Sequence, residues 1–516
     1  MNKRSASVAL LALLGGCSLM PDYERPSAMI PSAWPDSVQS GGVRKVANVD
    51  WQQYFPDPRL QALISAALQN NRDLRIATAR IAEARAQYGI QQADRLPNVN
   101  LAATRNASLT PAGASVTGSA LNTQRYDVAV SLVSFELDFW GRVSSLNAAA
   151  KNSFLATEAA LRAFRLSLIA DVANAYLSLL ELRERTQLTA ATVKARGEAR
   201  NLLMRRREVG VASELEFLQA EGAYQSVLAE RANLERQQAA AENLLDLLLG
   251  QSLAGIKDLP AGRDLAGQDI TPDLIAGLPA EVLLQRPDVL AAEHKLIAAN
   301  ANIGAARAAF LPRITLTGSG GTASSTLAGL FDAGSRAWNF QPVLIQPLFD
   351  AGRTSANIDI AHARKVIAVA EYEKTIQQAF REVADLLNAR DRIAEQLAAQ
   401  SANAQAQNQR LKLVEARYQA GIANQLEVLD AQREAFAAEQ GATQVRRLSL
   451  GVATQLYKAL AGEFSDAAQS ANQEVADRRK TFDGTTSHST RLSAEELLAG
   501  HPKDDNQVDG YIRATE

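Results

Sequence analysis

The sequence predicts an α+β fold built from one duplicated unit, in which very long helices carry two pairs of β-strands. A glycine-centred motif occurs twice, around Gly210 and Gly421. Each glycine lies 69 residues after a Gly-Arg pair that begins at Gly141 or Gly352. Two segments with alternating polar and apolar residues come before each Gly-Arg pair. The equal spacing in both halves predicts two equally long helices.

Composition narrows the class of protein. The chain has 516 residues and a formal net charge of -2, so it offers no basic surface and nucleic acid is excluded as an expected partner. Aromatic residues make up only 5% of the chain, which is few for a globular core of this size. Alanine dominates the middle segments, which favours helix and close helix packing.

The N-terminus resembles a bacterial lipoprotein signal. Lys3 and Arg4 precede an apolar run that ends in Leu14-Gly15-Gly16-Cys17. We expect residues 1–16 to be a signal peptide and Cys17, the only cysteine, to carry lipid. The alternative is a plain secretory signal with an incidental cysteine. Residues 17–56 are expected to form an extended segment, and no later stretch is expected to reach the roughly 20 apolar residues of a membrane helix.

The first repeat is predicted to span residues 57–278. It begins with a helix at 57–94, followed by a β-hairpin at 97–139 and a long proline-free helix from Gly141 to Gly210. A helix of that length runs about 100 Å and cannot fit inside a compact domain. A tip at 207–213, a return helix from Ser213 to Leu249 and an insert at 250–278 complete the repeat.

The second repeat is predicted to span residues 279–464. A helix at 279–309 comes first, then a β-hairpin at 312–349 and the second long helix. The tip at 417–424 leads into a return helix from Asn424 to Ala461. Residues 465–516 are polar and are expected to be a largely disordered tail.

The four strands suggest a membrane-spanning barrel shared between chains. Four strands cannot close a membrane barrel, which needs about eight. A dimer would give a filled interior, whereas a trimer would give twelve strands and leave a lumen. The row expected to face inward is polar and suits water; it includes Asn98, Asn100, Asn339 and Gln341. Aromatic residues could form interfacial belts: Tyr126, Phe135, Phe139, Trp140, Trp338 and Phe349. For Phe135 and Phe349, core packing is the alternative.

Several motifs together resemble the TolC-type outer membrane factors, specifically the lipidated OprM- or NodT-like branch. These are Cys17-Ser18-Leu19, Pro21-Asp22-Tyr23, Asp57-Pro58 with Leu60, LPAEVLLQRPDVLAAE at 278–293, and both tips. The resemblance implies a homotrimer with a twelve-stranded outer-membrane barrel, continued by an α-helical barrel in the periplasm. The insert and chain ends would form a belt around its middle.

The resemblance also implies a function, that of the exit duct of a tripartite efflux pump. The partners would be a periplasmic adaptor, an inner-membrane RND-type transporter and outer-membrane lipid. The duct would conduct drugs or other small molecules passively, without catalysis, cofactor or metal. His294 and His362 are isolated in the sequence, which leaves no metal-binding constellation.

Carboxylates follow the second tip on one helical face. Glu427, Asp430 and Glu434 are spaced at i, i+3 and i+7, and from spacing alone a solvated stripe is the better interpretation. The resemblance instead implies a periplasmic gate, which would comprise Leu426, Glu427, Asp430 and Arg433. The first repeat has Gln219 where the second has Asp430, so we expect the gate at the second tip.

Both tips are expected to contact the adaptor, although their residues also suit ordinary helix capping. The expected contact residues are Arg207, Val209, Gly210, Val211, Ala212, Ser213, Arg417, Ala420, Gly421, Ile422, Ala423 and Asn424. Two other functions stay open at this point. One is the outer-membrane component of type I protein secretion, and the other is a coiled-coil structural lipoprotein without a pore.

Overall fold

The computed structural model describes residues 18–27, 30–31, 50–116, 118–270 and 280–460. The signal peptide, Cys17 and the tail at 465–516 therefore lie outside the described residues. Within that part of the chain, eight α-helices are connected to a single four-stranded sheet.

The helices fall into long and short pairs. The two longest, α5 (Arg142–Glu208) and α8 (Arg353–Gln419), have 67 residues each. Their return helices, α6 (Glu214–Leu249) and α9 (Gln425–Leu460), have 36 residues each. The equal lengths expected from the glycine spacing are confirmed. The shorter helices are α2 (Trp51–Tyr54), α3 (Pro58–Asn70), α4 (Arg72–Ala93) and α7 (Pro287–Ala308).

The sheet contains β1 (Val99–Thr110), β2 (Leu121–Glu136), β3 (Arg313–Ser324) and β4 (Arg336–Ile345). The strands follow chain order and every neighbouring pair is antiparallel. The β1–β2 ladder continues in register up to the pair of Thr110 with Leu121, so residues 111–120 connect the two strands. The Ser108 and Thr123 hydroxyl oxygens lie 2.7 Å apart, and this hydrogen bond extends the ladder.

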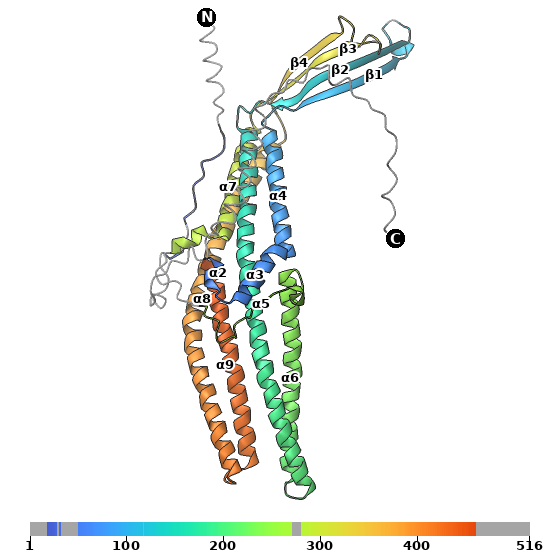
Figure 1. Cartoon of the computed structure of the whole chain (residues 1–516). Coiled ribbons are helices and arrows are strands. Elements are labelled where there is room, and N and C mark those ends of the chain that lie inside the picture. Colours follow the sequence, from blue (N-terminus) through green and yellow to red (C-terminus); the bar gives the residue numbers. More distant parts are fainter. Residues whose placement is uncertain (1–17, 28–29, 32–49, 117, 271–279, 461–516) are drawn as a thin grey trace, which may run out of the picture. The chain divides into compact units, whose positions relative to one another are not determined.

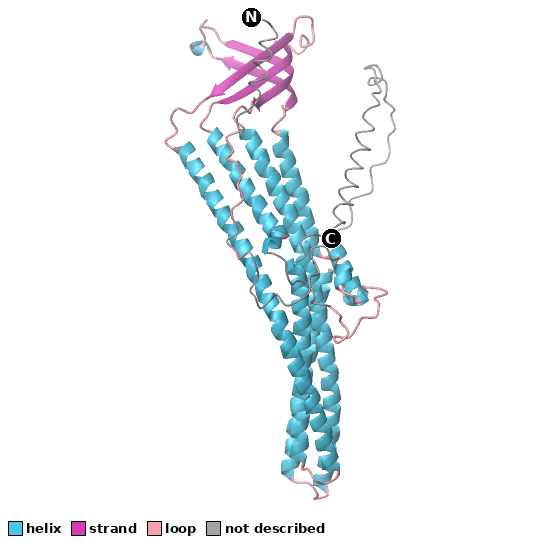
Figure 2. Cartoon of the chain, turned by 90° about the vertical axis from the view of Figure 1, so that its left-hand side faces the viewer, coloured by secondary structure: helices cyan, strands magenta, loops and turns pink. Residues whose placement is uncertain are grey.

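The sheet lies at one end of the helices and the two hairpin turns lie at the other (Figures 1 and 2). Helix α5 is central, because it packs against α4, α6, α7 and α9, while α8 packs against α7 and α9. A helix of 67 residues is about 100 Å long. The turns are thus held far from the strands.

Two predicted helices differ from the observed ones. The helix expected at 57–94 breaks at Asn71, whose side chain accepts from the Leu74 amide at 2.8 Å and donates to the Leu248 carbonyl at 2.9 Å. The helix expected from residue 279 starts only at Pro287, after a 3-10 turn at Ala280–Gln285. Proline suits the first turn of a helix and disfavours helix before itself.

Helix α5 also corrects the expectation about apolar segments. One window of this helix is long and apolar enough to cross a membrane by composition. However, 56% of that window is buried inside the protein. Residues such as Leu168, Ile169 and Val172 are almost inaccessible to solvent. Its apolar character is therefore used for packing against neighbouring helices.

Near the midpoint of the long helices, buried polar and aromatic contacts hold neighbouring segments together. Asp57 is fully buried and accepts hydrogen bonds from the Tyr176 hydroxyl at 3.0 Å, the Arg263 amide at 3.2 Å and the Gln268 side chain at 2.5 Å. The rings of Tyr54 and Tyr457 pack against each other at a tilt, with centroids 4.8 Å apart. The insert and the first short helices are thereby joined to α5 and α9.

The N-terminal strap, residues 18–27, is fixed on α7. Arg25 pairs with both carboxylate oxygens of Glu293 at 2.7 and 2.8 Å, and the Tyr23 hydroxyl donates to the same group at 3.0 Å. Burial beside this carboxylate raises the pKa of Tyr23, so the phenol stays protonated. Asn300 donates to the Pro21 carbonyl at 2.7 Å. The strap therefore enters the fold at a defined place.

Replacing Gly304 with alanine is expected to loosen this strap. A Cβ there would lie 2.8 Å from the Met20 Cα and 2.6 Å from the Ser145 Oγ. Overpacking of this kind costs about 1–3 kcal/mol. Cleavage after Glu24 by endoproteinase Glu-C should accelerate in the variant.

The control is Gly89→Ala, the equivalent position in the first repeat. No atom lies within 4 Å of a Cβ at Gly89, and alanine favours helix by up to about 1 kcal/mol. Equal cleavage rates for both variants would show that the strap does not depend on the close approach at Gly304.

Candidate functional site

The two tips have the same backbone construction. Gly210 and Gly421 adopt left-handed φ values of 77° and 75°, which other residues rarely adopt. The Val211 amide donates to the Arg206 carbonyl at 2.8 Å, and the equivalent Ile422 amide donates to Arg417 at 2.9 Å. These bonds satisfy the free carbonyls at the end of each long helix.

Each return helix begins with the same side-chain cap. The Glu216 amide donates to the Ser213 hydroxyl at 3.2 Å, while the Ser213 amide donates to the Glu216 carboxylate at 2.8 Å. These hydrogen bonds lower the pKa of Glu216, so the cap is complete above the usual glutamate pKa and weakens as the pH falls. At the second tip, the Glu427 amide donates to Asn424 at 2.9 Å and the Asn424 amide donates to Glu427 at 3.4 Å.

The predicted tip residues lie at the surface. All twelve are exposed or half-exposed. Val209, Val211 and Ile422 are 73%, 65% and 69% exposed. Apolar side chains exposed together on a turn indicate a contact surface. Arg207 is held back from this surface by Glu214 at 3.1 Å and the ring of Phe217, 4.3 Å from its guanidinium carbon.

The four predicted gate residues lie on the first three turns of α9. Leu426 is 57% exposed, and Glu427 is used in the cap with a second contact to Arg417 at 3.7 Å. Asp430 forms two ion pairs, one with Arg410 at 2.7 Å and one with Arg433 at 2.7 Å. Each carboxylate oxygen of Asp430 therefore faces a different guanidinium group.

Sequence reasoning missed Arg410. It lies on α8, and it meets Asp430 because the two residues are at similar distances on either side of the turn. The antiparallel register of a helical hairpin could have indicated this pairing. The α5–α6 hairpin of the first repeat does not have an equivalent of the Arg410–Asp430 pair. There Arg200 pairs with Glu221 at 2.5 Å, and Gln219 stands at the position equivalent to Asp430.

One face of the sheet is polar across all four strands. In one row, Asn100 pairs with Ser131, which pairs with Ser319, which pairs with Asn339. Directly paired residues project to the same face of an antiparallel sheet. The neighbouring pairs Thr317 with Gln341 and Thr104 with Asp127 continue this face. Its polar side chains are hydroxyls, amides and the Arg125–Asp127 ion pair, whose atoms lie 2.8 Å apart. The row between those of Asn100 and Thr104 holds the small residues Ala102, Ala129, Gly321 and Ala337.

The opposite face is apolar over most of its length. Leu101, Val130, Gly320 and Trp338 form one row, and Val99, Leu132, Gly318 and Phe340 form the next. Trp338 is 82% exposed and Leu101 is 75% exposed. An apolar face of this size opposite a polar one is typical of a sheet between hydrocarbon and water.

A bulge explains why the sequence alternation slips after Leu132. The register shifts between Leu132 and Phe135, and Ser134 adopts a positive φ of 51°. Its amide donates to the Thr317 hydroxyl at 3.2 Å. The extra residue returns Phe135 to the apolar face opposite Leu316, and it places Glu136 on the polar one.

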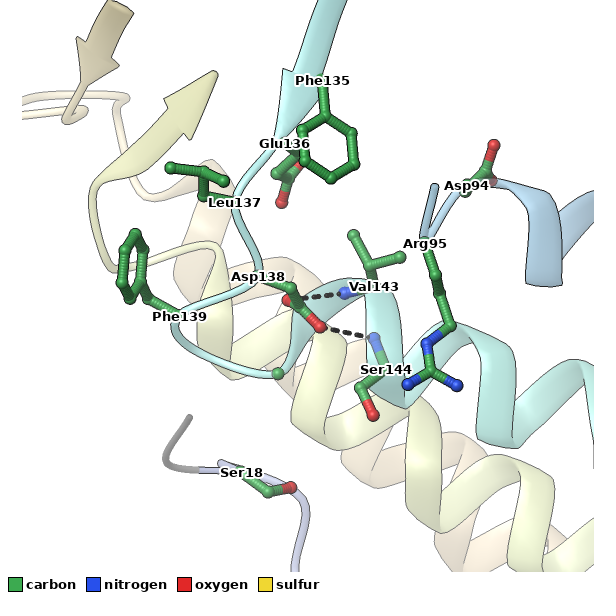
Figure 3. Close-up of a pocket in the computed structure, with 11 residues that line it drawn as sticks. Ser18, Asp94, Arg95, Phe135, Glu136, Leu137, Asp138, Phe139, Val143 and Ser144 are labelled. Atoms are coloured by element: carbon green, nitrogen blue, oxygen red, sulfur yellow. Dashed lines mark hydrogen bonds between the residues drawn. The ribbon is translucent and has the colours of Figure 1, made fainter. Parts of the chain in front are cut away.

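At the junction of sheet and helices, Glu136 and Asp138 lie beside Phe135 and Phe139 (Figure 3). Asp138 caps α5 by accepting from the amides of Val143 at 3.0 Å and Ser144 at 2.7 Å. Glu136 binds Arg142 through both oxygens, at 2.7 and 2.6 Å, and also pairs with Arg313 at 2.7 Å. A cavity of about 360 Å³ lies beside them, with Phe135 and Phe139 in its wall.

Two further residues singled out in the sequence, Trp140 and His294, form contacts within the chain. The predicted belt residue Trp140 donates its indole N–H to the Pro312 carbonyl at 2.8 Å, which ties the two repeats together at the junction. His294 contacts Asn152 at 3.1 Å, and burial lowers the pKa of this histidine. Among the described residues no three histidine, cysteine or acidic side chains form a group that could hold a metal ion.

Comparison with known proteins agrees with this geometry. The model of the outer membrane efflux protein family matches residues 63–251 and 278–462. Outer membrane protein OprJ of Pseudomonas aeruginosa is 44% identical over 467 residues, which cover 89% of this chain and 96% of the relative. Toluene efflux pump outer membrane protein TtgI of Pseudomonas putida is 42% identical, with coverages of 90% and 99%.

A solved structure shares the fold. The open state of the MtrE outer membrane channel of Neisseria gonorrhoeae superimposes with a TM-score of 0.79 at 36% identity, and it covers 86% of this chain and 98% of that one. Family match, identity and fold all point to transport across the outer membrane. The chain belongs to the outer membrane efflux protein family and is an outer-membrane efflux channel.

Proposed function

We propose that three copies of this chain form the passive exit duct of a tripartite efflux pump. The observation that carries the proposal is the two-faced sheet, with an apolar row such as Leu101–Val130–Gly320–Trp338 beside a polar row such as Asn100–Ser131–Ser319–Asn339. Twelve such strands would enclose a water-filled lumen, whereas eight would fill their own interior. Substrates would cross this lumen without chemistry.

The proposed duct continues through the helices into the periplasm. Helices α5, α6, α8 and α9 from three chains would surround a common axis, with the tips at the inner end. The exposed apolar residues Val209, Val211 and Ile422 support docking of a periplasmic adaptor there. The adaptor would connect the duct to an inner-membrane RND-type transporter, which supplies the energy.

Anchoring by lipid on Cys17 is part of the proposal. It rests on the Leu14-Gly15-Gly16-Cys17 box in the sequence. The fixed position of the strap is consistent with this anchor. Ser18, the residue after Cys17 in the sequence, lines the cavity beside the sheet. Mass spectrometry of the mature N-terminal peptide should detect the added acyl mass, and an unmodified Cys17 would contradict the anchor.

Lysine at both tips is expected to uncouple the pump. In Val211→Lys with Ile422→Lys, charge replaces the exposed apolar surface, and crosslinking to the adaptor should fall at least about tenfold. Drug accumulation in cells should rise to the level of the deletion strain. The purified channel should keep its conductance, because the tip backbone bonds are retained.

The control is Val116→Lys, a fully exposed valine in the β1–β2 connection at the opposite end of the helices. This variant should crosslink and export normally. Retained crosslinking and export in the double tip variant would overturn the assignment of the tips as the adaptor contact.

The substrate class is proposed from relatives that are named for toluene and solvent efflux. We expect deletion of the gene to sensitise cells to apolar solvents and drugs. Secretion of proteins through a type I system is the competing outcome. Unchanged susceptibility together with loss of a secreted protein would favour that alternative.

A further inference from the structure

Two arginines interrupt the apolar face of the sheet near the end that lies away from the helices. Arg105 lies on β1 in the row that continues through Tyr126 to Ser324. Arg336 lies on β4 in the adjacent apolar-face row, which runs from Ala103 through Val128 and Thr322. They are thus the charges at one limit of an otherwise apolar face.

The strand register fixes how far these rows lie from the helix end of the sheet. Between the Arg336 row and the helix end of the sheet, the paired residues of this face are apolar or glycine: Val99, Leu101, Val130, Leu132, Phe135, Ile314, Leu316, Gly318, Gly320, Trp338, Phe340, Pro342 and Leu344. The Arg336 row itself holds Ala103, Val128 and Thr322. From Ile314 to Ser324 the strand is about 34 Å long at 3.4 Å per residue. A tilt of about 40° reduces this to roughly 26 Å along the membrane normal, close to the 25 Å height of an outer-membrane apolar band.

The position of these two arginines allows them to contact lipid headgroups. An arginine in the middle of the band would be strongly unfavourable, whereas one at its edge can extend its guanidinium to the interface. Both side chains are exposed, and neither has a carboxylate partner among the residues that the structure describes. The Arg105 guanidinium carbon lies over the Tyr126 ring, 5.5 Å from its centre, so the side chain packs against its neighbour in the same row.

Arg125 provides the contrast on the same strands. It neighbours Tyr126 in sequence but lies on the polar face, where Asp127 neutralises it at 2.8 Å. Among the described residues, the arginine on the polar face therefore has an anionic partner, while the two arginines on the apolar face have none. The anion available at their level in a bilayer is a lipid phosphate, which guanidinium binds through two parallel hydrogen bonds.

We propose that Arg105 and Arg336 bind phosphate groups of an anionic lipid in the outer leaflet of the outer membrane. The proposal rests on the proposed function in one respect, the insertion of the sheet into that membrane. A three-copy barrel would carry six such arginines around its rim. Bound lipid would fix the height of the barrel in the bilayer and reinforce contacts between neighbouring protomers.

The test uses the purified full-length channel in detergent. Native mass spectrometry would measure binding of bisphosphorylated lipid A, dephosphorylated lipid A and phosphatidylcholine, with inorganic phosphate as a soluble competitor. The variants are Arg105→Gln with Arg336→Gln and, as the matched control, Arg125→Gln. Loss of charged hydrogen bonds should weaken binding of bisphosphorylated lipid A by about tenfold or more in the double variant. Arg125→Gln should bind like the unaltered channel.

Failure of the lipid site and failure of the proposed channel function give different results in this test. Equal affinity of the double variant and the unaltered channel for bisphosphorylated lipid A, or equal affinity of the unaltered channel for both forms of lipid A, would overturn the site. Displacement by inorganic phosphate at millimolar concentration would also overturn it, because the site would then be a free-anion site. Conductance should be the same in all variants, since these arginines lie outside the lumen. Absence of conductance in the unaltered protein would instead contradict the proposed function.

Discussion

Replacing Asp430 with alanine is expected to open the periplasmic entrance and raise single-channel conductance. The change removes the carboxylate that faces both Arg410 and Arg433 at 2.7 Å. In a three-copy duct, six guanidinium groups would then repel one another around one axis. Each of these exposed ion pairs contributes only about 0–1 kcal/mol, but six of them shift the equilibrium between closed and open states by roughly 1–5 kcal/mol.

Planar-bilayer recording checks this prediction, together with susceptibility to antibiotics too large for the closed duct. Because screening weakens repulsion between exposed charges, the increase in conductance should be larger at 0.1 M salt than at 1 M. The triple variant Asp430→Ala with Arg410→Ala and Arg433→Ala removes both signs of charge and should return toward the unaltered conductance.

Gln219→Ala is the matched control in the first repeat, since Gln219 is equivalent to Asp430 and carries no charge. It should leave conductance unchanged. If Asp430→Ala and Gln219→Ala have the same conductance and the same leakage of large antibiotics, Asp430 is not part of a gate.

Replacing Arg286 with alanine is expected to have the largest effect on stability. Its side chain is only 9% exposed, and it joins three helices. It pairs with Asp288 at 2.8 Å and Glu382 at 2.9 Å, and donates to the Ala459 carbonyl at 3.0 Å. Removal leaves these acceptors without their cation. The free energy of unfolding should fall by about 2–4 kcal/mol. This is somewhat less than for a fully buried pair, because both carboxylates are partly exposed to solvent.

Thermal unfolding followed by helical circular dichroism would measure this loss. Arg286→Lys should recover only part of it, because an ammonium group cannot reproduce the fork of a guanidinium. Arg381→Ala is the control, since Arg381 is 79% exposed and lies 3.9 Å from its Asp385 partner. That variant should stay within about 0.5 kcal/mol of the unaltered protein. A similar small loss for Arg286→Ala would show that the three helices are held without it.

The elements that the sequence predicted well are those set by local chemistry. Gly210 and Gly421 require positive φ, and their spacing from Gly141 and Gly352 determines the helix lengths. The strand pairs are visible because a strand between lipid and water must alternate. Such signals depend on near neighbours in the chain, so one sequence suffices to read them.

Features set by distant contacts were not predictable in the same way. The cap from Asn71 to Leu74 is local, whereas the hydrogen bond from Asn71 to the Leu248 carbonyl depends on helix packing. The second partner of Asp430 is Arg410 on another helix, which becomes predictable only with the register of the hairpin. Arg105 shares a strand face with Leu101 and Ala103 by local alternation, but the row that it forms with Tyr126 and Ser324 follows only from the register across the sheet. In each case the deciding partner lies many residues away, and its identity follows from helix and strand pairing.

The central claim is that the polar face of the sheet lines a pore and the apolar face contacts lipid. Asn100→Cys and Leu101→Cys test it directly, because these adjacent residues project to opposite faces. In planar bilayers, a charged methanethiosulfonate reagent should reduce the conductance of Asn100→Cys and leave that of Leu101→Cys unchanged. Block of Leu101→Cys without block of Asn100→Cys, or no conductance in the unaltered protein, would contradict the account.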